Sequence, residues 1–411
     1  MTAHTARVAF NPFDAEFRRD PYPHYRQLRE TRPIHRTLGM WVLTRYADVR
    51  GVLHDRTFSA ALIPRQVSAQ AERLGQSDMT LIDRLGRTSL VFTDNPEHAR
   101  LRALVNRAFT TQHIEGLRPI ITAAATRLLE QARRKSTVDI IADFAAPLPV
   151  AVLCEWMELP DELRARIGPW THDIRFLLEP GLMTAHDLAR VHTVVTAFTG
   201  ALRPIIDQRR AAPGQDLISA LLTSYTLGGN ALTDDEVMLL TIMCFVAGLE
   251  TTKSLIGNAL LALLRHPEQA ELLRARPELT RAAVAETLRY DPPLQLTKRL
   301  ATRDIELEDR LIRARDQVLL CLAAANRDPE IFDRPDDFDL TRAPADHLAF
   351  GHGMHGCLGA PLAALQAEIA LDVLHRHTTE IRLTTTDFDW QQHSFILRGL
   401  TRLPITLRGN G

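Results

Sequence analysis

The spacing of apolar residues predicts that the middle of the chain is helical. Apolar side chains recur at helical intervals through three long segments, residues 111–135, 186–210 and 234–264. Each is longer than the average helix of a globular protein, which has about 11–12 residues. Proline and glycine residues, whose backbone limits end helices, lie between them at 179–181, 212–214, 228–230 and 291–293. We therefore expect long helices separated by short loops.

Short segments of strand character lie near both ends of the chain. Residues 21–30 have the pattern of a short helix, and 33–37 and 40–44 then flank Leu38 and Gly39 like two strands of a tight hairpin. Further strand-like pieces follow the helical region, at 305–307, 317–322, 395–397 and 405–407. The sequence therefore predicts a mainly α fold with small β-sheets. Because there is no internal repeat and no long linker, we expect one large domain covering residues 1–411.

Composition and charge are those of a globular protein without a polyanionic partner. Apolar residues make up 45% of the chain and charged residues 24%, and 49 basic against 50 acidic residues leave a formal net charge of -1. This balance gives no general attraction to nucleic acid or to an anionic membrane. The longest uncharged apolar run, residues 237–249, has thirteen residues and is too short to cross a bilayer. We expect neither nucleic acid nor membrane as a partner.

The cysteines and the N-terminus both indicate a reducing, cytoplasmic location. Cys154, Cys244, Cys321 and Cys357 lie far apart and form no CxxC pair, so a disulfide framework or a structural zinc module is not expected. The first residues lack the positive and apolar regions of a secretory signal.

The segment 347–363, HLAFGHGMHGCLGAPLA, is the most informative part of the chain. It holds the glycines 351, 353, 356 and 359, the cysteine at 357, and then the apolar face of a helix. Such a loop folds closely around a sulfur and delivers it to a helix N-terminus. Backbone N–H groups and the helix dipole favour a thiolate there, and a thiolate is a strong, soft metal ligand.

Three other interpretations of this segment stay open on its residues alone. The spacing Gly351-x-Gly353-x-x-Gly356 matches the dinucleotide fingerprint, although that motif requires a preceding strand and a βαβ unit. His352, His355 and Cys357 would crowd three zinc ligands into six residues without a clear fourth. A purely structural glycine-rich loop is the third.

Other segments also combine polar groups with helical spacing. Thr233 and Glu236 form a capping box before the apolar run of 237–249, which ends in Glu250 and Thr251. An ionisable group at the end of such a run is costly unless it is paired or functional. Residues that share one helical face at i, i+3 or i, i+4 are Glu286 with Arg289, and His98 with Arg102.

The sequence FGHGMHGCLG resembles the haem-binding signature of the cytochromes P450, FxxGxxxCxG, which here begins at Phe350 and Gly351. The resemblance extends from about residue 11 to the last predicted strands. It implies a cytochrome P450 fold with a single haem domain, in which Cys357 is the proximal thiolate ligand of haem b iron. It also implies that His355 binds a haem propionate, together with His98, Arg102 and Arg299.

The resemblance also gives roles to two further motifs. The sequence AGLET is similar to the oxygen-activating stretch, where a helix opens beside the haem: Glu250 and Thr251 would relay protons, and Ala247 and Gly248 would leave space. Glu286 and Arg289 match the buried ExxR pair. In relatives an arginine of the PxRF segment is the third member of this ionic network, but Asp337 stands at that position here. The sequence therefore leaves a three-membered network in doubt. Gly356 and Ala364 also differ from the residues that relatives often carry at these positions.

The function that the resemblance implies is that of a haem-thiolate monooxygenase. It would activate dioxygen and hydroxylate or epoxidise a hydrophobic small molecule such as a terpenoid, fatty acid or polyketide. Electrons would come ultimately from NAD(P)H through a ferredoxin reductase and a ferredoxin, with Arg100 and Arg107 as candidate contacts of a monomeric enzyme. The substrate would contact the loop 61–90, the region 176–183, and the residues Met243, Leu294, Phe395 and Ile396.

Two other haem proteins and one protein without haem are the alternatives. A peroxide-driven peroxygenase would share haem and cysteine, but the intact Glu250–Thr251 pair favours dioxygen chemistry. A non-catalytic haem sensor or carrier would keep Cys357 without needing the relay. A nicotinamide-dependent oxidoreductase built on Gly351–Gly356 would contain no haem.

Overall fold

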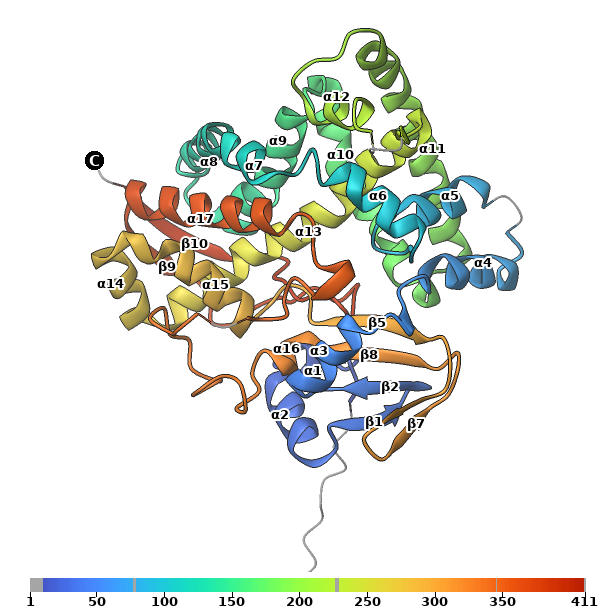
Figure 1. The fold of residues 1–411 in the computed structure, drawn as a ribbon. Coiled ribbons are helices and arrows are strands. Elements are labelled where there is room, and N and C mark those ends of the chain that lie inside the picture. The colour runs from blue at the N-terminus through green and yellow to red at the C-terminus, as the bar shows by residue number, and fades with distance from the viewer. Residues whose placement is uncertain (1–9, 77–78, 226–228, 345, 410–411) are drawn as a thin grey trace, which may run out of the picture. The chain divides into compact units, whose positions relative to one another are not determined.

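The computed structural model describes residues 10–76, 79–225, 229–344 and 346–409. Over these residues the chain is mainly helical with three small sheets, which confirms the predicted fold class (Figure 1). The chain divides into two compact units, each assembled from separate stretches. Unit 1 comprises residues 1–59, 257–357 and 385–403, and unit 2 comprises 60–256, 358–384 and 404–411. The single domain expected for residues 1–411 stays a prediction.

Unit 1 is built on a five-stranded sheet of order β1-β2-β8-β5-β3. Its strands are β1 (Ile34–Thr37), β2 (Met40–Leu43), β8 (Gln317–Cys321), β5 (Leu296–Ala301) and β3 (Phe58–Ser59). The predicted hairpin joins β1 to β2: Leu38 and Gly39 have φ values of 51° and 75°, the left-handed conformation that a two-residue turn requires. β2 runs parallel to β8, and the other neighbours are antiparallel.

The other elements of unit 1 are short helices and a second, two-stranded sheet. They are α1 (Ala15–Arg19), α2 (Tyr22–Thr31), α3 (Tyr46–His54), α14 (Pro267–Ala275), α15 (Thr280–Tyr290), α16 (Leu322–Ala325), the 3₁₀ turns Pro277–Leu279 and Gly353–His355, and β6 (Ile305–Leu307) with β7 (Arg310–Ile312).

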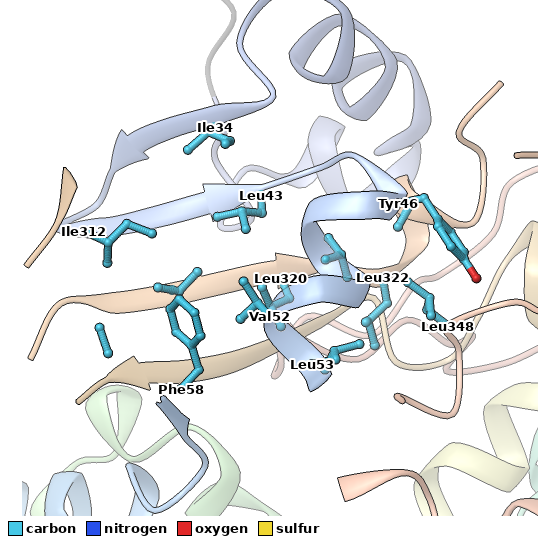
Figure 2. Packing of buried hydrophobic residues seen from close by; sticks show 14 of the residues in the cluster. Ile34, Leu43, Tyr46, Val52, Leu53, Phe58, Ile312, Leu320, Leu322 and Leu348 are labelled. Carbon is cyan, nitrogen blue, oxygen red and sulfur yellow. The ribbon is translucent and has the colours of Figure 1, made fainter. Parts of the chain in front are cut away.

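An apolar core joins α3 to the sheet of unit 1. Figure 2 shows this cluster, to which α3 contributes Val52 and Leu53, β2 contributes Leu43 and β8 contributes Leu320. Leu348 belongs to the same cluster and is 1% exposed. Because Leu348 is the second residue of the segment 347–363, that segment starts from a fixed point on the core.

Unit 2 is a set of packed helices with a three-stranded sheet, β4-β10-β9. The strands are β4 (Val138–Asp139), β9 (Thr378–Leu383) and β10 (Pro404–Gly409). The helices are α4 (Ile63–Arg73), α5 (Thr80–Thr88), α6 (Glu97–Val105), α7 (Thr111–Gly116), α8 (Arg118–Ala132), α9 (Pro147–Trp156), α10 (Asp161–Ile174), α11 (Ala185–Ala211), α12 (Leu217–Leu222), α17 (Ala360–His377), a π-helical turn (Ile141–Ala145) and two 3₁₀ turns (Arg175–Leu178, Pro180–Leu182).

The longest helix, α13 (Asp234–Arg265), agrees with the predicted segment 234–264, and its residues 234–256 belong to unit 2. The predicted capping box is confirmed: the Glu236 N–H donates to Thr233 Oγ1 at 3.2 Å, and the Thr233 N–H donates to Glu236 Oε2 at 2.8 Å. By length and composition alone α13 is apolar enough to cross a membrane. However, 67% of its most apolar window is buried within the structure, as in an ordinary core helix, so this finding is weak.

Several predicted elements need correction. Residues 111–135 form two helices rather than one, because the chain turns at Leu117 and α8 then begins at Arg118, with Pro119 in its first turn. Residues 61–90 are mostly the helices α4 and α5 rather than a loop. Residues 395–397 contribute a single bridge, Leu294 to Leu397, instead of a strand. Of the predicted break at 228–230, Gly228 lies outside the described residues, as do residues 1–9.

Candidate functional site

The cysteine loop of unit 1 is closed by its own backbone. The Cys357 N–H donates to the Phe350 carbonyl at 2.8 Å, and the Gly351 N–H donates to the Leu348 carbonyl at 2.9 Å. None of the four cysteines, all of which the structure describes, forms a disulfide; Cys154 and Cys321 are buried, Cys244 is half-buried and Cys357 alone is exposed. The loop therefore presents one accessible sulfur from a fixed backbone.

Two glycines of this loop have conformations that other residues rarely adopt. Gly351 and Gly353 have φ values of +71° and +68°, in the left-handed region. A Cβ on Gly353 would lie 3.0 Å from the Leu53 carbonyl oxygen and 3.3 Å from the His54 Cα at the end of α3. At Gly356, a Cβ would meet the Gly353 carbonyl oxygen at 3.3 Å. Glycine thus lets the loop pack directly against α3.

The structure gives no support to the dinucleotide and zinc interpretations of this loop. The described residues immediately before Gly351 form a turn, whereas the dinucleotide motif requires a strand. Among the residues that the structure describes, no group of three or more histidine, cysteine or acidic side chains is arranged to hold a metal ion.

Glu286 and Arg289 form the predicted buried pair on α15. Arg289 donates from Nε to Glu286 Oε2 at 2.8 Å and from Nη2 to Oε1 at 2.7 Å, and the two side chains are 3% and 4% exposed. The doubt about a network of three is resolved by Arg342, which sequence reasoning missed: its Nε lies 3.1 Å from Glu286 Oε1. Asp337 instead contributes its main-chain carbonyl, which accepts from Arg289 at 2.8 Å. The network therefore has three charged members.

Asn326 connects this network to the cysteine loop. Its carbonyl accepts from Arg289 Nη1 at 3.2 Å, and its side-chain Oδ1 accepts from the Leu348 N–H at 2.6 Å. Leu348 in turn accepts from Gly351. The loop is thus held both by the apolar core and by a buried ionic network.

The remaining predicted residues of unit 1 lie on β5 and the segment beside it. Arg299 is buried on β5, and its Nη1 donates to the Lys298 carbonyl at 2.8 Å. The predicted substrate residues lie close together, since the Gln295 N–H, next to Leu294, donates to the Ile396 carbonyl at 2.8 Å. The Lys298 ammonium lies 4.7 Å from the ring centre of Phe395.

His98 and Arg102 lie one turn apart on α6 of unit 2, as predicted. His98 is 1% exposed, and Arg102 is half-buried. Arg100, on another face, forms ion pairs with Glu97 and Glu236 and so ties α6 to the start of α13. The guanidinium of Arg107 lies 5.5 Å from the ring centre of Tyr225.

The predicted oxygen-activating residues lie on α13. The Thr251 hydroxyl donates to the Ala247 carbonyl at 2.8 Å, and Ala247 is exposed within an otherwise mostly buried stretch. The expected opening of the helix is wrong for this structure: α13 is continuous through these residues, and the local feature is the side-chain bond to the backbone. A Cβ on Gly248 would meet Leu153 Cδ1 at 3.5 Å, an ordinary contact.

Glu250 is held ionised by cations that the sequence did not indicate. Burial raises the pKa of its carboxyl, but the neighbouring His172 ring, the Lys253 ammonium and the Arg175 guanidinium together lower it to about 2. Lys253 Nζ lies 2.5 Å from Glu250 Oε2, and His172 Nδ1 lies 3.9 Å from Oε1. Lys253 is one turn away on α13, whereas His172 and Arg175 come from the end of α10.

We expect the substitution Glu250→Gln to lower stability in a pH-dependent way. The folded pKa of about 2 lies below the ordinary value of 4.5, so the carboxylate stabilises the fold fully above pH 4.5 and loses this effect as the pH falls towards 2. A change of this size corresponds to about 3 kcal/mol at neutral pH. Urea unfolding at a series of pH values measures the difference between the variant and the wild type. A difference that stays constant through that pH window would contradict the assignment.

Unit 2 contains an apolar pocket, whose lining includes Val246, four residues before Glu250 on α13. α4, α5, α10, the turn Arg175–Leu178 and α13 form its walls, and its lining carries no charged side chain. The lining residues are Ile63, Pro64, Val67, Ile82, Leu85, Gly86, Phe92, Ile174, Leu177, Leu178, Met243 and Val246. Met243 and the two predicted regions 61–90 and 176–183 thus line one pocket. Such a lining suits an apolar ligand.

The residues present fit a haem group. Haem needs a soft anionic ligand for iron, cations for its two carboxylates and apolar surface for its ring. Unit 1 offers the exposed sulfur of Cys357, the half-buried ring of Phe350 and the cation Arg299.

Comparisons with known proteins agree with this chemistry. The family profile described as Cytochrome P450 matches residues 173–389. The biotin biosynthesis cytochrome P450 of Bacillus subtilis is 35% identical, over 97% of this chain and 99% of that protein. The vitamin D(3) 25-hydroxylase of Pseudonocardia autotrophica is 33% identical, over 96% of each chain. The crystal structure of P450BioI in complex with acyl carrier protein ligated to hexadec-9Z-enoic acid has a TM-score of 0.86 and 34% identity, covering 96% of this chain and 99% of that chain.

Full-length similarity of this kind establishes the family as well as the fold. The chain therefore belongs to the cytochrome P450 family of haem-thiolate monooxygenases, which bind haem b and receive electrons that come ultimately from NAD(P)H.

Proposed function

We propose that Cys357 provides the axial thiolate and that His355, His98, Arg102 and Arg299 bind the haem carboxylates. The observation that carries the proposal is the single exposed thiol on a loop closed by its own backbone. When bound, haem supplies the redox chemistry that activates dioxygen, and a thiolate ligand favours O–O cleavage. Phe350 and Gly351 fix the other end of the loop.

The absorption spectrum of the reduced protein with carbon monoxide tests the thiolate assignment. The red-shifted band of a haem thiolate is expected. Haem without that band would mean that Cys357 is protonated or is not the ligand. Absence of haem after reconstitution would overturn the whole assignment.

Glu250 and Thr251 are the proton-relay residues in this proposal. The Glu250 carboxyl stays ionised at neutral pH because its pKa is lowered to about 2, so in the relay it accepts hydrogen bonds from the groups that pass the proton on and does not hold the proton itself. The Thr251 hydroxyl is fixed by its bond to the Ala247 carbonyl at 2.8 Å. Ala247 and Gly248 carry little side chain, which supports the proposal that they leave space for small reactants.

The substitution Thr251→Ala should uncouple electron use from product formation. Without the positioned hydroxyl, proton delivery fails and reduced oxygen leaves as peroxide; a general acid or its equivalent is typically worth about 10²–10⁴-fold in rate. The measurement compares product formed, peroxide released and NAD(P)H consumed. Thr241→Ala is the matched control, because the Thr241 hydroxyl makes the same bond to the residue four positions earlier, at 2.7 Å, in a buried part of α13. Unchanged coupling in Thr251→Ala would refute the relay.

The substrate is proposed to be an apolar or amphipathic small molecule such as a terpenoid, fatty acid or polyketide. The uncharged lining of the unit 2 pocket, which includes Met243, supports this class. Leu294, Phe395 and Ile396 of unit 1 are proposed as further substrate contacts. The relatives named above include both a protein of biotin biosynthesis and a vitamin D(3) hydroxylase. A panel of such compounds, screened for shifts of the haem spectrum, tests the class.

The electron donors are proposed to be a ferredoxin and its NAD(P)H-dependent reductase, acting on a monomeric, cytoplasmic enzyme. The net charge of -1 and the ion pairs that occupy Arg100 leave Arg107 as the better candidate contact of the two. Turnover that does not respond to added ferredoxin would contradict this partner.

A further inference from the structure

The helices α4 and α5 of unit 2 come unusually close at Gly86 and Pro64. A Cβ built on Gly86 would lie 3.0 Å from Pro64 Cγ and 3.3 Å from Pro64 Cβ. Pro64 stands in the first turn of α4, where its ring is fixed and cannot rotate away as a flexible side chain would. A side chain at position 86 would therefore have to push the two helices apart.

This close contact is a feature of position 86 rather than of helical glycines in general. Gly116, Gly168 and Gly200 lie in other helices of the same unit, and at each of them a Cβ would meet nothing within 4 Å. Of the four glycines Gly86, Gly116, Gly168 and Gly200, only Gly86 would place a Cβ against a rigid ring of a neighbouring helix.

The contact lies in the wall of the apolar pocket. Gly86 and Pro64 both line the pocket, beside Val67 of α4 and Ile82 and Leu85 of α5. These three apolar side chains are 1–4% exposed, so they are tightly packed. Close-packed interiors transmit small displacements, so a change in the distance between α4 and α5 would also move the side chains that line the pocket.

We propose that Gly86 determines substrate specificity. By letting α5 close onto Pro64, it sets the width of the pocket between α4 and α5 and favours slender substrates over broad polycyclic ones. The inference rests on the proposed function, in which this pocket receives the substrate.

A double-mutant cycle tests the proposal on the haem-loaded enzyme. The variants are Gly86→Ala, Pro64→Ala and the double substitution, with Gly200→Ala as the matched control because position 200 has open space. Equilibrium dialysis gives the dissociation constants of two probes, hexadec-9Z-enoic acid as the slender one and testosterone as the broad one. Thermal unfolding verifies that each variant is folded.

The proposal predicts that Gly86→Ala lowers the ratio of the testosterone dissociation constant to the fatty-acid dissociation constant by about tenfold or more, the effect expected when a pocket changes by a methyl group. Removal of the proline ring in the double variant should restore the wild-type ratio, and Gly200→Ala should leave it unchanged. An unchanged ratio in folded Gly86→Ala, or a changed ratio that persists in the double variant, would overturn the specificity role. If the wild type has the haem-thiolate spectrum but binds neither probe, the pocket assignment itself fails, and the inference fails with it.

Discussion

Replacement of Cys357 by serine should abolish both the red-shifted carbon monoxide band and monooxygenation. A serine hydroxyl stays protonated at neutral pH and is a hard, weak ligand, so the electron-rich thiolate is lost. The fold should survive, because the hydrogen bond of Cys357 to the Phe350 carbonyl comes from the backbone and does not need the sulfur. The spectrum, product formation and far-ultraviolet circular dichroism of the variant measure these three expectations.

Cys154→Ala is the matched control for this substitution. Cys154 is a buried thiol of α9, and burial raises its pKa to about 12, so it is protonated and inert. Its removal should cost some stability but leave the band in place. A band that persists in Cys357→Ser, or disappears in Cys154→Ala, would assign the ligand elsewhere.

Local patterns in the sequence predicted local structure well. The hairpin at Leu38 and Gly39 and the capping box of Thr233 and Glu236 are both confirmed, because each depends on a few neighbouring residues with restricted backbone or side-chain chemistry. The fold class and the family are confirmed too. The ordered motifs along the chain, rather than periodicity, carried the family assignment.

Local sequence patterns could not predict contacts between segments that lie far apart in the chain. His172 meets Glu250 from another helix, and no local pattern links α10 to α13. Arg342 was missed because the expected place for the third arginine was position 337, whereas the chain loops back so that position 342 reaches Glu286. The contact of Gly86 with Pro64 likewise depends on how two helices cross. Tertiary packing brings these residues together, and the spacing of apolar residues along the chain does not predict which distant residues will meet.

The cysteine loop depends on one of these distant contacts, the buried network around Glu286. The substitution Glu286→Gln should lower the free energy of unfolding by about 3–5 kcal/mol, because it leaves two arginines without their buried counter-charge. Arg289 is 3% exposed and Arg342 is 12% exposed, so water cannot replace the lost carboxylate. Urea unfolding of the haem-loaded protein measures the loss.

The same substitution should also lower the haem content, and this second effect separates a role in the site from ordinary stability. Arg289 holds the carbonyl of Asn326, whose side chain fixes the Leu348 N–H just before the cysteine loop, so disorder in the network reaches Cys357. Glu115→Gln is the matched control: Glu115 also pairs with an arginine three residues later, at 3.0 Å, but on an exposed surface, where a pair contributes about 0–1 kcal/mol. The network would have no special role if the two variants lost similar stability, or if Glu286→Gln kept the haem content of the wild type. A large loss of both in Glu286→Gln alone would show that the ionic network, and not the glycine loop by itself, holds the sulfur in place.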